Sequence, residues 1–293
     1  MTPRTTGIAL LLLTAINWGA TWPLLKFLMT EMPPLTLRAM GTVIIAVVLG
    51  LGAWLFRISL AVPRAQWGRL VLYALLNVTA WMSFGTIALR WLSASEGSIL
   101  AYTMPVWAAL FAWPILGEKP SATRLVGLVL GVGSIAILLA GRGADVGMEK
   151  LPGLLLILAS AVLFALGAVL SKRRPLTLHP ITSLGWQMAI GCIPMVILAP
   201  LLESFHPAQV SGTVWFWFGW TVIFCMGLSY LTWFGALARL PASTAALGTL
   251  LAPVLSVIAA AIFLGEPLGL REVFALLGTV AAVALAVGSR DKP

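Results

Sequence analysis

Charged residues are scarce in this sequence: only 9% of its 293 residues are Asp, Glu, Lys or Arg, whereas 60% are hydrophobic. Soluble proteins of average composition carry about 25% charged residues, so this chain has too few to cover a water-exposed surface of its size. The shortage argues against a soluble enzyme, a nucleic-acid-binding protein and a disordered scaffold. It predicts an integral membrane protein.

Cysteine is scarce as well, and its two copies, Cys192 and Cys225, lie inside apolar runs. A disulfide framework needs more cysteines in a loop-rich chain, so we interpret both as small buried hydrophobic residues. A glycine pattern at 131–136 matches a dinucleotide fingerprint, but it lies in an apolar run with no strand before it. We therefore predict no enzyme activity, no cofactor and no metal; a membrane enzyme or a lipid scramblase is the alternative from another class.

Long apolar runs are what the sequence has in abundance. A helix needs about 20 apolar residues to cross about 30 Å of hydrocarbon, and alternating strands of the kind that build a barrel are absent. We predict ten transmembrane helices, which begin near Gly7, Leu35, Gly68, Ser95, Ala122, Pro152, Ile181, Thr213, Ser243 and Leu270. Most Lys and Arg residues, including the run at 172–174, then lie on the side of the N-terminus. The positive-inside rule places both termini in the cytoplasm.

The second half of the chain repeats the first. Pro34 is matched by Pro180, Met104-Pro105-Val106 by Ala252-Pro253-Val254, and the Leu-Gly-Glu turn at 116–118 by the one at 264–266. The spacing is nearly constant and is half the chain length. Five helices per half is an odd number, so the second half must enter the membrane from the opposite side. We predict an all-α membrane fold of two inverted five-helix repeats, 1–145 and 146–293, an organisation typical of secondary transporters.

The order of these features resembles the drug/metabolite transporter superfamily, in particular its ten-helix EamA-type members. The resemblance is carried by Asn17-Trp18-Gly19 with Lys26, by Pro105 and Pro253, and by the two Leu-Gly-Glu turns. Within that superfamily the tryptophan-rich interior is most similar to the YddG-type exporters of aromatic amino acids. The resemblance implies a cavity lined by spans one, three, four, six, eight and nine, and a function in metabolite export from a cell through its inner membrane.

Polar and aromatic residues share helical faces within these spans, which is informative because polar groups are costly in hydrocarbon. We predict a substrate site without fixed charge that combines stacking faces with hydroxyl and amide groups. Its candidate residues are Asn17, Trp18, Thr21, Tyr73, Asn77, Trp81, Ser98, Tyr102, Phe164, Tyr230, Trp233 and Thr244. Each also has a plainer interpretation as a helix-packing residue. Pro105 and Pro253 each remove a backbone hydrogen bond in mid-span, and we predict paired hinges or static kinks there.

Charge at the centre of the spans is missing. Lys26, Arg38, Arg90 and Glu96 lie near span ends, where we expect long side chains to snorkel towards the membrane boundary. This disfavours proton antiport through a core carboxylate and substrates that need a buried counter-charge. The expected partners are the lipid bilayer and a neutral or zwitterionic small molecule, with aromatic and hydrophobic amino acids as first choice and a broad drug or metabolite range as the alternative. Because both repeats lie in one chain, a monomer can form the pathway without a protein partner.

Overall fold

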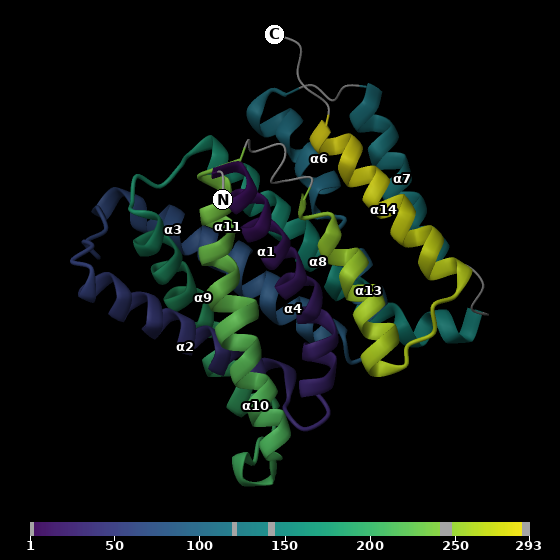
Figure 1. Ribbon diagram of the computed structural model, residues 1–293, viewed down its shortest axis with the longest axis horizontal. Helices are drawn as coiled ribbons and strands as arrows, with labels where there is room; N and C mark the ends of the chain where they lie inside the picture. The colour runs from purple at the N-terminus through teal and green to yellow at the C-terminus, as the bar shows by residue number, and fades with distance from the viewer. Residues whose placement is uncertain (1–2, 119–121, 140–143, 241–247, 289–293) are drawn as a thin grey trace.

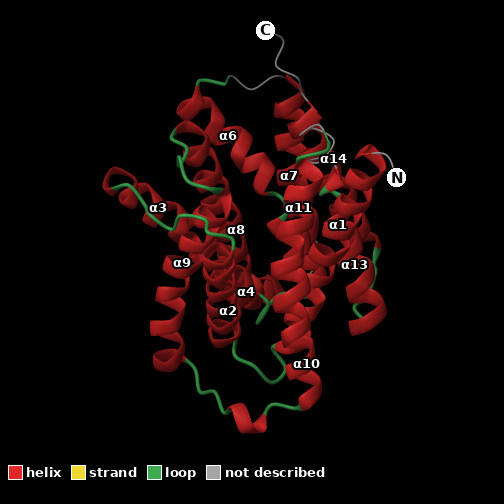
Figure 2. Cartoon of the chain, turned by 60° about the vertical axis from the view of Figure 1, so that its left-hand side comes forward, coloured by secondary structure: helices red, strands yellow, loops and turns green. Residues whose placement is uncertain are grey.

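The protein is built from long apolar helices. The computed structural model describes residues 3–118, 122–139, 144–240 and 248–288, and in these residues all regular structure is helical (Figure 2). Within them, seven helices are long and apolar enough to cross a membrane, and shorter apolar helices such as Leu251–Leu264 accompany them. Large apolar side chains are exposed along the outer helices, for example Val48, Leu51 and Trp54. Such surfaces are unfavourable in water and normal in lipid, so the prediction of an all-α membrane fold is confirmed.

The first half of the chain follows the predicted order of spans, but two of its spans are interrupted. Its elements are α1 (Pro3–Leu28), α2 (Pro34–Leu55), η1 (Arg64–Gln66), α3 (Trp67–Ala74), η2 (Leu75–Ala80), α4 (Trp81–Ala88), α5 (Ala94–Ala101), α6 (Met104–Leu116) and α7 (Ala122–Leu139). Here η1 is a 3₁₀ turn and η2 is a π-helical segment. The third predicted span therefore runs from η1 to α4, and the fourth is divided between α5 and α6.

The second half shows the same pattern of interruptions. Its elements are α8 (Ala144–Arg173), α9 (Pro180–Leu202), η3 (Pro207–Gln209), α10 (Gly212–Trp220), η4 (Thr221–Leu228), α11 (Ser229–Leu237), α13 (Leu251–Leu264) and α14 (Leu270–Gly288). The segment η4 is π-helical, and it lies at the spacing of the sequence repeat from η2. The turn at 102–103 before α6 corresponds in the same way to the turn at 249–250 before α13. The two halves therefore share their departures from regular helix as well as their sequence motifs.

Helices from the two halves pack against each other throughout the molecule (Figure 1): α7 lies against α14, α2 against α9, α6 against α8, and α1 against both α11 and α13. Small residues permit the closest approaches. A Cβ added at Gly19 of α1 would lie 2.9 Å from the carbonyl oxygen of Ala252, and one at Gly278 of α14 would lie 2.3 Å from Ser134 Oγ of α7. Gly278 thus permits the close packing of α14 against α7.

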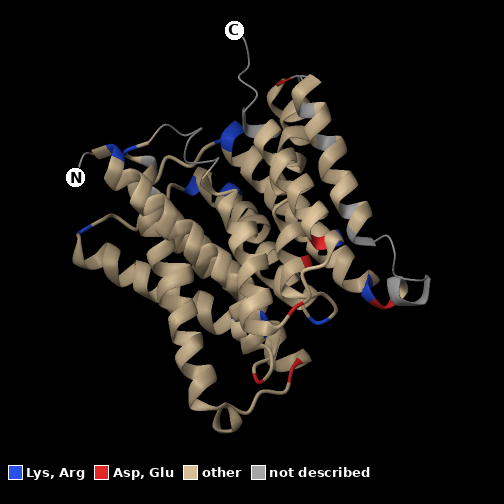
Figure 3. Cartoon of the chain, turned by 45° about the vertical axis from the view of Figure 1, so that its right-hand side comes forward, with Lys and Arg blue, Asp and Glu red and all other residues tan. Residues whose placement is uncertain are grey.

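The helices define two ends of the molecule. We call the end where α1 begins and α14 ends the terminal face, and the end where α1 gives way to α2 the far face (Figures 1 and 2). Lys and Arg side chains gather near the terminal face, whereas most Asp and Glu side chains lie towards the far face (Figure 3). The charges thus leave a largely uncharged band of helix between the two ends, as a membrane requires.

Candidate functional site

Three aromatic rings from three helices meet in the interior. Trp81 at the start of α4 lies 4.7 Å from Phe164 of α8 between ring centroids, and 6.4 Å from Trp22 of α1 in an edge-on arrangement. These separations are typical of attractive aromatic pairs. Trp22 is buried, whereas Trp81 and Phe164 are partly exposed. We call these three residues the aromatic cluster; it unites two predicted site residues and adds Trp22, which the sequence analysis missed.

A second aromatic pair joins α1 to α11. The rings of Trp18 and Trp233 lie 5.5 Å apart, so two more of the predicted residues come together. Beside them the hydroxyls of Thr14 and Thr232 share a hydrogen bond of 2.7 Å, and both threonines are buried. A hydroxyl pair of this kind ties membrane helices together at about 0.6 kcal/mol. The α1–α11 contact is therefore both a packing interface and an aromatic surface shared by the two halves.

Two predicted amides, Asn17 and Asn77, each have one enclosed atom without a hydrogen bond to the described residues; Asn17 is buried and Asn77 is half-buried. Within the described part of the chain, the Nδ2 of Asn17 in α1 has no hydrogen-bond partner, and neither has the Oδ1 of Asn77 in η2. Asn77 packs against α8 at Gly167, where an added Cβ would lie 2.0 Å from Asn77 Oδ1. An unsatisfied buried polar group costs about 1–3 kcal/mol. The described fold thus encloses one amide donor and one amide acceptor without using either.

Three of the predicted residues have their polar groups occupied by the backbone. The Tyr73 hydroxyl lies 2.9 and 2.8 Å from the carbonyl oxygens of Leu170 and Arg174, where it holds α3 against the end of α8. The Ser98 hydroxyl donates to the carbonyl oxygen of Ser95 at 3.0 Å, and the Thr21 hydroxyl donates to the carbonyl oxygen of Asn17 at 3.0 Å. We therefore leave Tyr73 and Ser98 out of the site that we propose below.

The predicted hinge prolines lie where the helices break. Pro105 is in the first turn of α6, directly after the turn that contains Tyr102, and Pro253 has the same place in α13. Proline cannot donate the hydrogen bond that would continue a helix across this point. Pro105 therefore accompanies a divided span, as in the discontinuous helices of transporters, and Pro253 likewise follows a turn, at 249–250. Thr244, the last predicted site residue, lies outside the described residues.

Arg38 departs from the sequence-based expectation. Its side chain does not snorkel to the membrane boundary; the residue is only 7% exposed, and its Nε donates to Thr86 Oγ1 of α4 at 2.6 Å. Tyr230 of α11 and Cys225 of η4 lie within electrostatic reach of the guanidinium. The expectation was wrong because α4 and η4 pack against α2, and Tyr230 of α11 approaches the guanidinium, although Arg38 is near the start of α2 in sequence.

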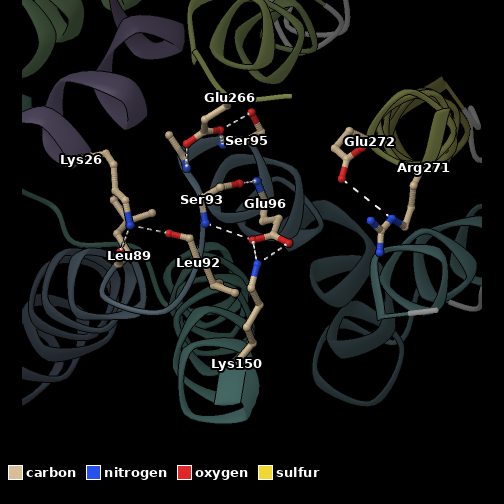
Figure 4. A network of polar contacts seen from close by, with 11 residues as sticks. Lys26, Leu89, Leu92, Ser93, Ser95, Glu96, Lys150, Glu266, Arg271 and Glu272 are labelled. Atoms are coloured by element: carbon tan, nitrogen blue, oxygen red, sulfur yellow. Dashed lines mark hydrogen bonds and ion pairs between the residues drawn. The ribbon is translucent and has the colours of Figure 1, made fainter. Parts of the chain in front are cut away.

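Carboxylates at the far face connect the two halves. Glu266, in the turn after α13, accepts hydrogen bonds from the backbone N–H groups of Ala94 (2.6 Å) and Ser95 (2.9 Å), and from Ser95 Oγ (2.6 Å), so it caps the N-terminus of α5 (Figure 4). Anions are favourable at this position because a helix N-terminus carries partial positive charge. This gives the Leu-Gly-Glu turn at 264–266 a structural role that joins its own half to the other.

Neighbouring charges extend this network (Figure 4). Glu96 of α5 forms a capping box with Ser93 and an ion pair with Lys150 of α8, at 2.7 Å between Nζ and Oε2. Lys26 at the end of α1 donates to the carbonyl oxygens of Leu89 and Leu92. The ends of α1, α4, α5 and α8 are thereby fixed at the far face by charge-assisted hydrogen bonds.

Two further glutamates cap helices of the opposite half at the same face. Glu203 accepts from the backbone N–H groups of Leu35 (3.0 Å) and Thr36 (2.8 Å) at the start of α2, and forms an ion pair with Arg90 at 3.2 Å. Glu31 accepts from the backbone N–H (2.6 Å) and the hydroxyl of Ser211, before α10. Movement of the halves at this face would break these bonds.

The fold and site thus describe a membrane protein whose helices are interrupted around an aromatic and amide-lined interior. The sequence model of the EamA-like transporter family matches this chain twice, over residues 5–140 and 151–288. The chain therefore belongs to the EamA-like transporter family, and it is a multi-pass membrane transporter of the drug/metabolite type rather than an enzyme.

Curated relatives and a solved structure agree with this assignment. The uncharacterized transporter YvbV of Bacillus subtilis (strain 168) is 32% identical to this chain, and the match covers 99% of this chain and 94% of YvbV. The uncharacterized transporter YoaV of the same organism is 24% identical, over 82% of each chain. This chain is similar in fold to the protein in a solved crystal structure, with a TM-score of 0.67 and 21% sequence identity. The match covers 98% of this chain and 97% of the other.

Proposed function

We propose that this transporter exports small neutral or zwitterionic metabolites, above all aromatic and hydrophobic amino acids, through the inner membrane of the cell. It does so by alternating access between two inverted five-helix repeats, 1–145 and 146–293, without a carboxylate in its core. The aromatic cluster is the observation that carries the proposal. Its rings form one tilted and one edge-on pair, and an aromatic contact between such a ring and a solute is worth about 0.5–1.5 kcal/mol beyond burial.

The repeat supports the alternating-access part of the proposal. The family matches the chain twice, the π-helical segments lie at corresponding places in both halves, and so do the turns before α6 and α13. π-helical turns are frequent at functional sites, and interrupted helices form the binding sites of many transporters. Two inverted copies of one unit have two nearly equivalent arrangements, of which one opens to each side. The excess of Lys and Arg near the terminal face supports a cytoplasmic location for that face.

A broad drug or metabolite exporter is the second candidate. It is favoured by the nature of the aromatic cluster, because stacking recognises any flat apolar group and carries little directional information. The unsatisfied amide atoms of Asn17 and Asn77 favour an amino acid exporter, because hydrogen bonds to them would stabilise a bound solute that has donors and acceptors of its own.

Transport in proteoliposomes tests the proposal. The purified protein is reconstituted and uptake is measured for L-tryptophan, L-phenylalanine, L-leucine, L-serine and a planar cationic dye. We expect uptake of the aromatic and large aliphatic amino acids. Trp81→Ala should reduce uptake of the aromatic ones by up to about tenfold, because one aromatic pair between this ring and the solute is worth about 0.5–1.5 kcal/mol. Trp81→Phe should restore most of it. Trp54→Ala is the matched control, since Trp54 is 72% exposed on the outer surface of α2.

The outcomes separate the alternatives. Uptake of the dye at a rate similar to that of the amino acids supports the broad exporter. Unchanged uptake in Trp81→Ala removes the aromatic cluster from the pathway. Uphill amino-acid movement driven by an imposed pH gradient contradicts transport without proton coupling.

A further inference from the structure

Arg38 is a cation in the protein interior that is left with unused hydrogen-bond donors. Its Nε donates to Thr86 Oγ1 at 2.6 Å, which is the single hydrogen bond of its side chain to the described residues. A guanidinium carries five N–H donors, four of them on its two terminal nitrogens. These terminal nitrogens have no partner in the described part of the chain, although the residue is only 7% exposed.

The described carboxylates are unavailable to Arg38 because each of the buried or paired ones has another partner. Glu31, Glu203 and Glu266 accept from helix N-termini, Glu96 and Glu118 pair with Lys150 and Lys172, and Glu272 accepts from Gly269. Glu149 is exposed and lies on α8, away from α2 in sequence and in helix packing. Arg38 therefore has no counter-ion among the side chains that the structure describes, which do not include that of Asp145.

The surroundings of Arg38 come from both halves of the chain. Arg38 and Thr86 belong to α2 and α4 of the first half, whereas Tyr230 and Cys225 approach from α11 and η4 of the second. The hydroxyl of Thr21, a predicted site residue on α1, interacts with the Cys225 thiol. A small molecule bound at the guanidinium would thus contact elements that must move relative to each other during alternating access.

An unpaired cation in this place is costly to retain. Removal of a charge from water costs several kcal/mol even after the protein relaxes, and an ionisable group within a membrane span is by default a functional candidate. The guanidinium is a planar fork that matches a carboxylate through two parallel hydrogen bonds. One monovalent cation balances one carboxylate, whereas a phosphate dianion would leave a second charge without a partner in the described interior.

We propose that Arg38 binds the carboxylate of the transported solute. This assignment rests on the proposed function and specifies its substrate class: the solute is a zwitterion or a monocarboxylate. Its carboxylate supplies the negative charge that no described side chain provides to Arg38. The same molecule with an amide in place of the carboxylate forfeits the charge-assisted hydrogen bonds. Since such bonds are worth about 1.5–3 kcal/mol, an amide should bind roughly 10- to 100-fold more weakly.

Acid and amide pairs of ligand test this assignment on the intact protein. Binding is measured as ligand-induced stabilisation of the purified full-length protein, and transport is measured in proteoliposomes. The probes are L-tryptophan with L-tryptophanamide, L-leucine with L-leucinamide, indole-3-propionate, and inorganic phosphate. In the wild-type protein each acid should bind at least tenfold more tightly than its amide. In Arg38→Gln this preference should disappear, and in Arg38→Lys it should be reduced because the fork is lost.

Arg90→Gln is the matched control. It removes the same charge from the same half of the chain, but the Arg90 side chain is 47% exposed at the far face, so the acid preference should stay intact. The acid and amide comparison in the wild-type protein needs no variant, so equal binding overturns the assignment even if Arg38→Gln fails to fold; Arg38→Lys, which keeps the charge, then attributes the preference to Arg38. Equal binding of acids and amides by the wild type, or a preference that survives in Arg38→Gln, overturns the assignment.

The same measurements distinguish failure of this assignment from failure of the proposed function. Transport of tryptophan with no discrimination against its amide leaves the function standing and overturns the role of Arg38. Binding of leucine or indole-3-propionate but not tryptophan, with the acid preference lost in Arg38→Gln, supports Arg38 and refutes aromatic amino acids as substrates. Stabilisation by inorganic phosphate alone, or by none of the probes, overturns the carboxylate assignment.

Discussion

The substitution Glu203→Gln examines how the two halves are held together at the far face. The Glu203 side chain is 3% exposed and accepts hydrogen bonds from Leu35 N, Thr36 N and Thr36 Oγ1, at 3.0, 2.8 and 2.9 Å. It also pairs with Arg90, whose side chain is 47% exposed. The carboxylate is thus a buried cap on α2 and, at its edge, a member of a solvent-accessible ion pair.

The geometry sets the expected loss. Glutamine keeps one acceptor oxygen, but its NH2 group faces a backbone N–H that it cannot satisfy. A hydrogen bond to a charged group contributes about 1.5–3 kcal/mol, and a buried donor left unpaired costs about 1–3 kcal/mol. We therefore expect Glu203→Gln to lower the free energy of unfolding by about 3 kcal/mol. Arg90→Ala should cost less than about 1 kcal/mol, because an exposed ion pair contributes little.

Unfolding in mixed detergent and SDS micelles, followed by tryptophan fluorescence, measures both values. Glu149→Gln is the control, because Glu149 is an exposed residue near the start of α8 and the change removes the same charge. If Arg90→Ala destabilises the protein as much as Glu203→Gln does, the ion pair rather than the helix cap holds this face, and the reasoning is refuted. A negligible loss in Glu203→Gln refutes it as well.

Two further predictions concern packing and helix breaks. Gly278→Val should lower the free energy of unfolding by about 1–3 kcal/mol, because the new Cβ would lie 2.3 Å from Ser134 Oγ; Gly133→Ala, with open space at its Cβ, should be nearly neutral, and equal unfolding midpoints would contradict this. Pro105→Ala should let α5 and α6 join into one helix and so slow amino-acid uptake in proteoliposomes. Pro194→Ala, inside the continuous α9, should leave uptake unchanged, and similar rates in both variants would argue against a hinge.

The positions of the helices follow from the sequence to a large extent. The predicted starts at Leu35, Ala122, Ile181 and Leu270 agree with α2, α7, α9 and α14 to within a residue. These boundaries were predictable because a charged or proline-containing segment ends each apolar run. The π-helical segments η2 and η4 were not predicted, since a single extra residue in a turn leaves no mark on an apolar sequence.

The candidate site was predicted only in part. The structure brings Trp81 together with Phe164 and Trp18 together with Trp233, and all four are among the predicted candidates, although the sequence did not pair them. The shared helical faces also selected Tyr73, because a helical stripe shows which residues point one way but not how far along the span a partner lies. Its hydroxyl is instead bonded near the end of α8.

The sequence by itself determined that this protein is an all-helical membrane protein with a repeated organisation, because lipid leaves a chain with 9% charged residues almost no alternative to apolar helices. Only the tertiary structure decided which charges are buried. The sequence predicted that Arg38 snorkels, whereas in the structure it is buried and bonded to Thr86 of α4. Glu203 and Glu266 follow the ends of apolar runs in the sequence, and in the structure they accept hydrogen bonds from helix N-termini of the other half. The reason is physical: burial is a property of what packs against a residue, and those partners lie far away in the sequence.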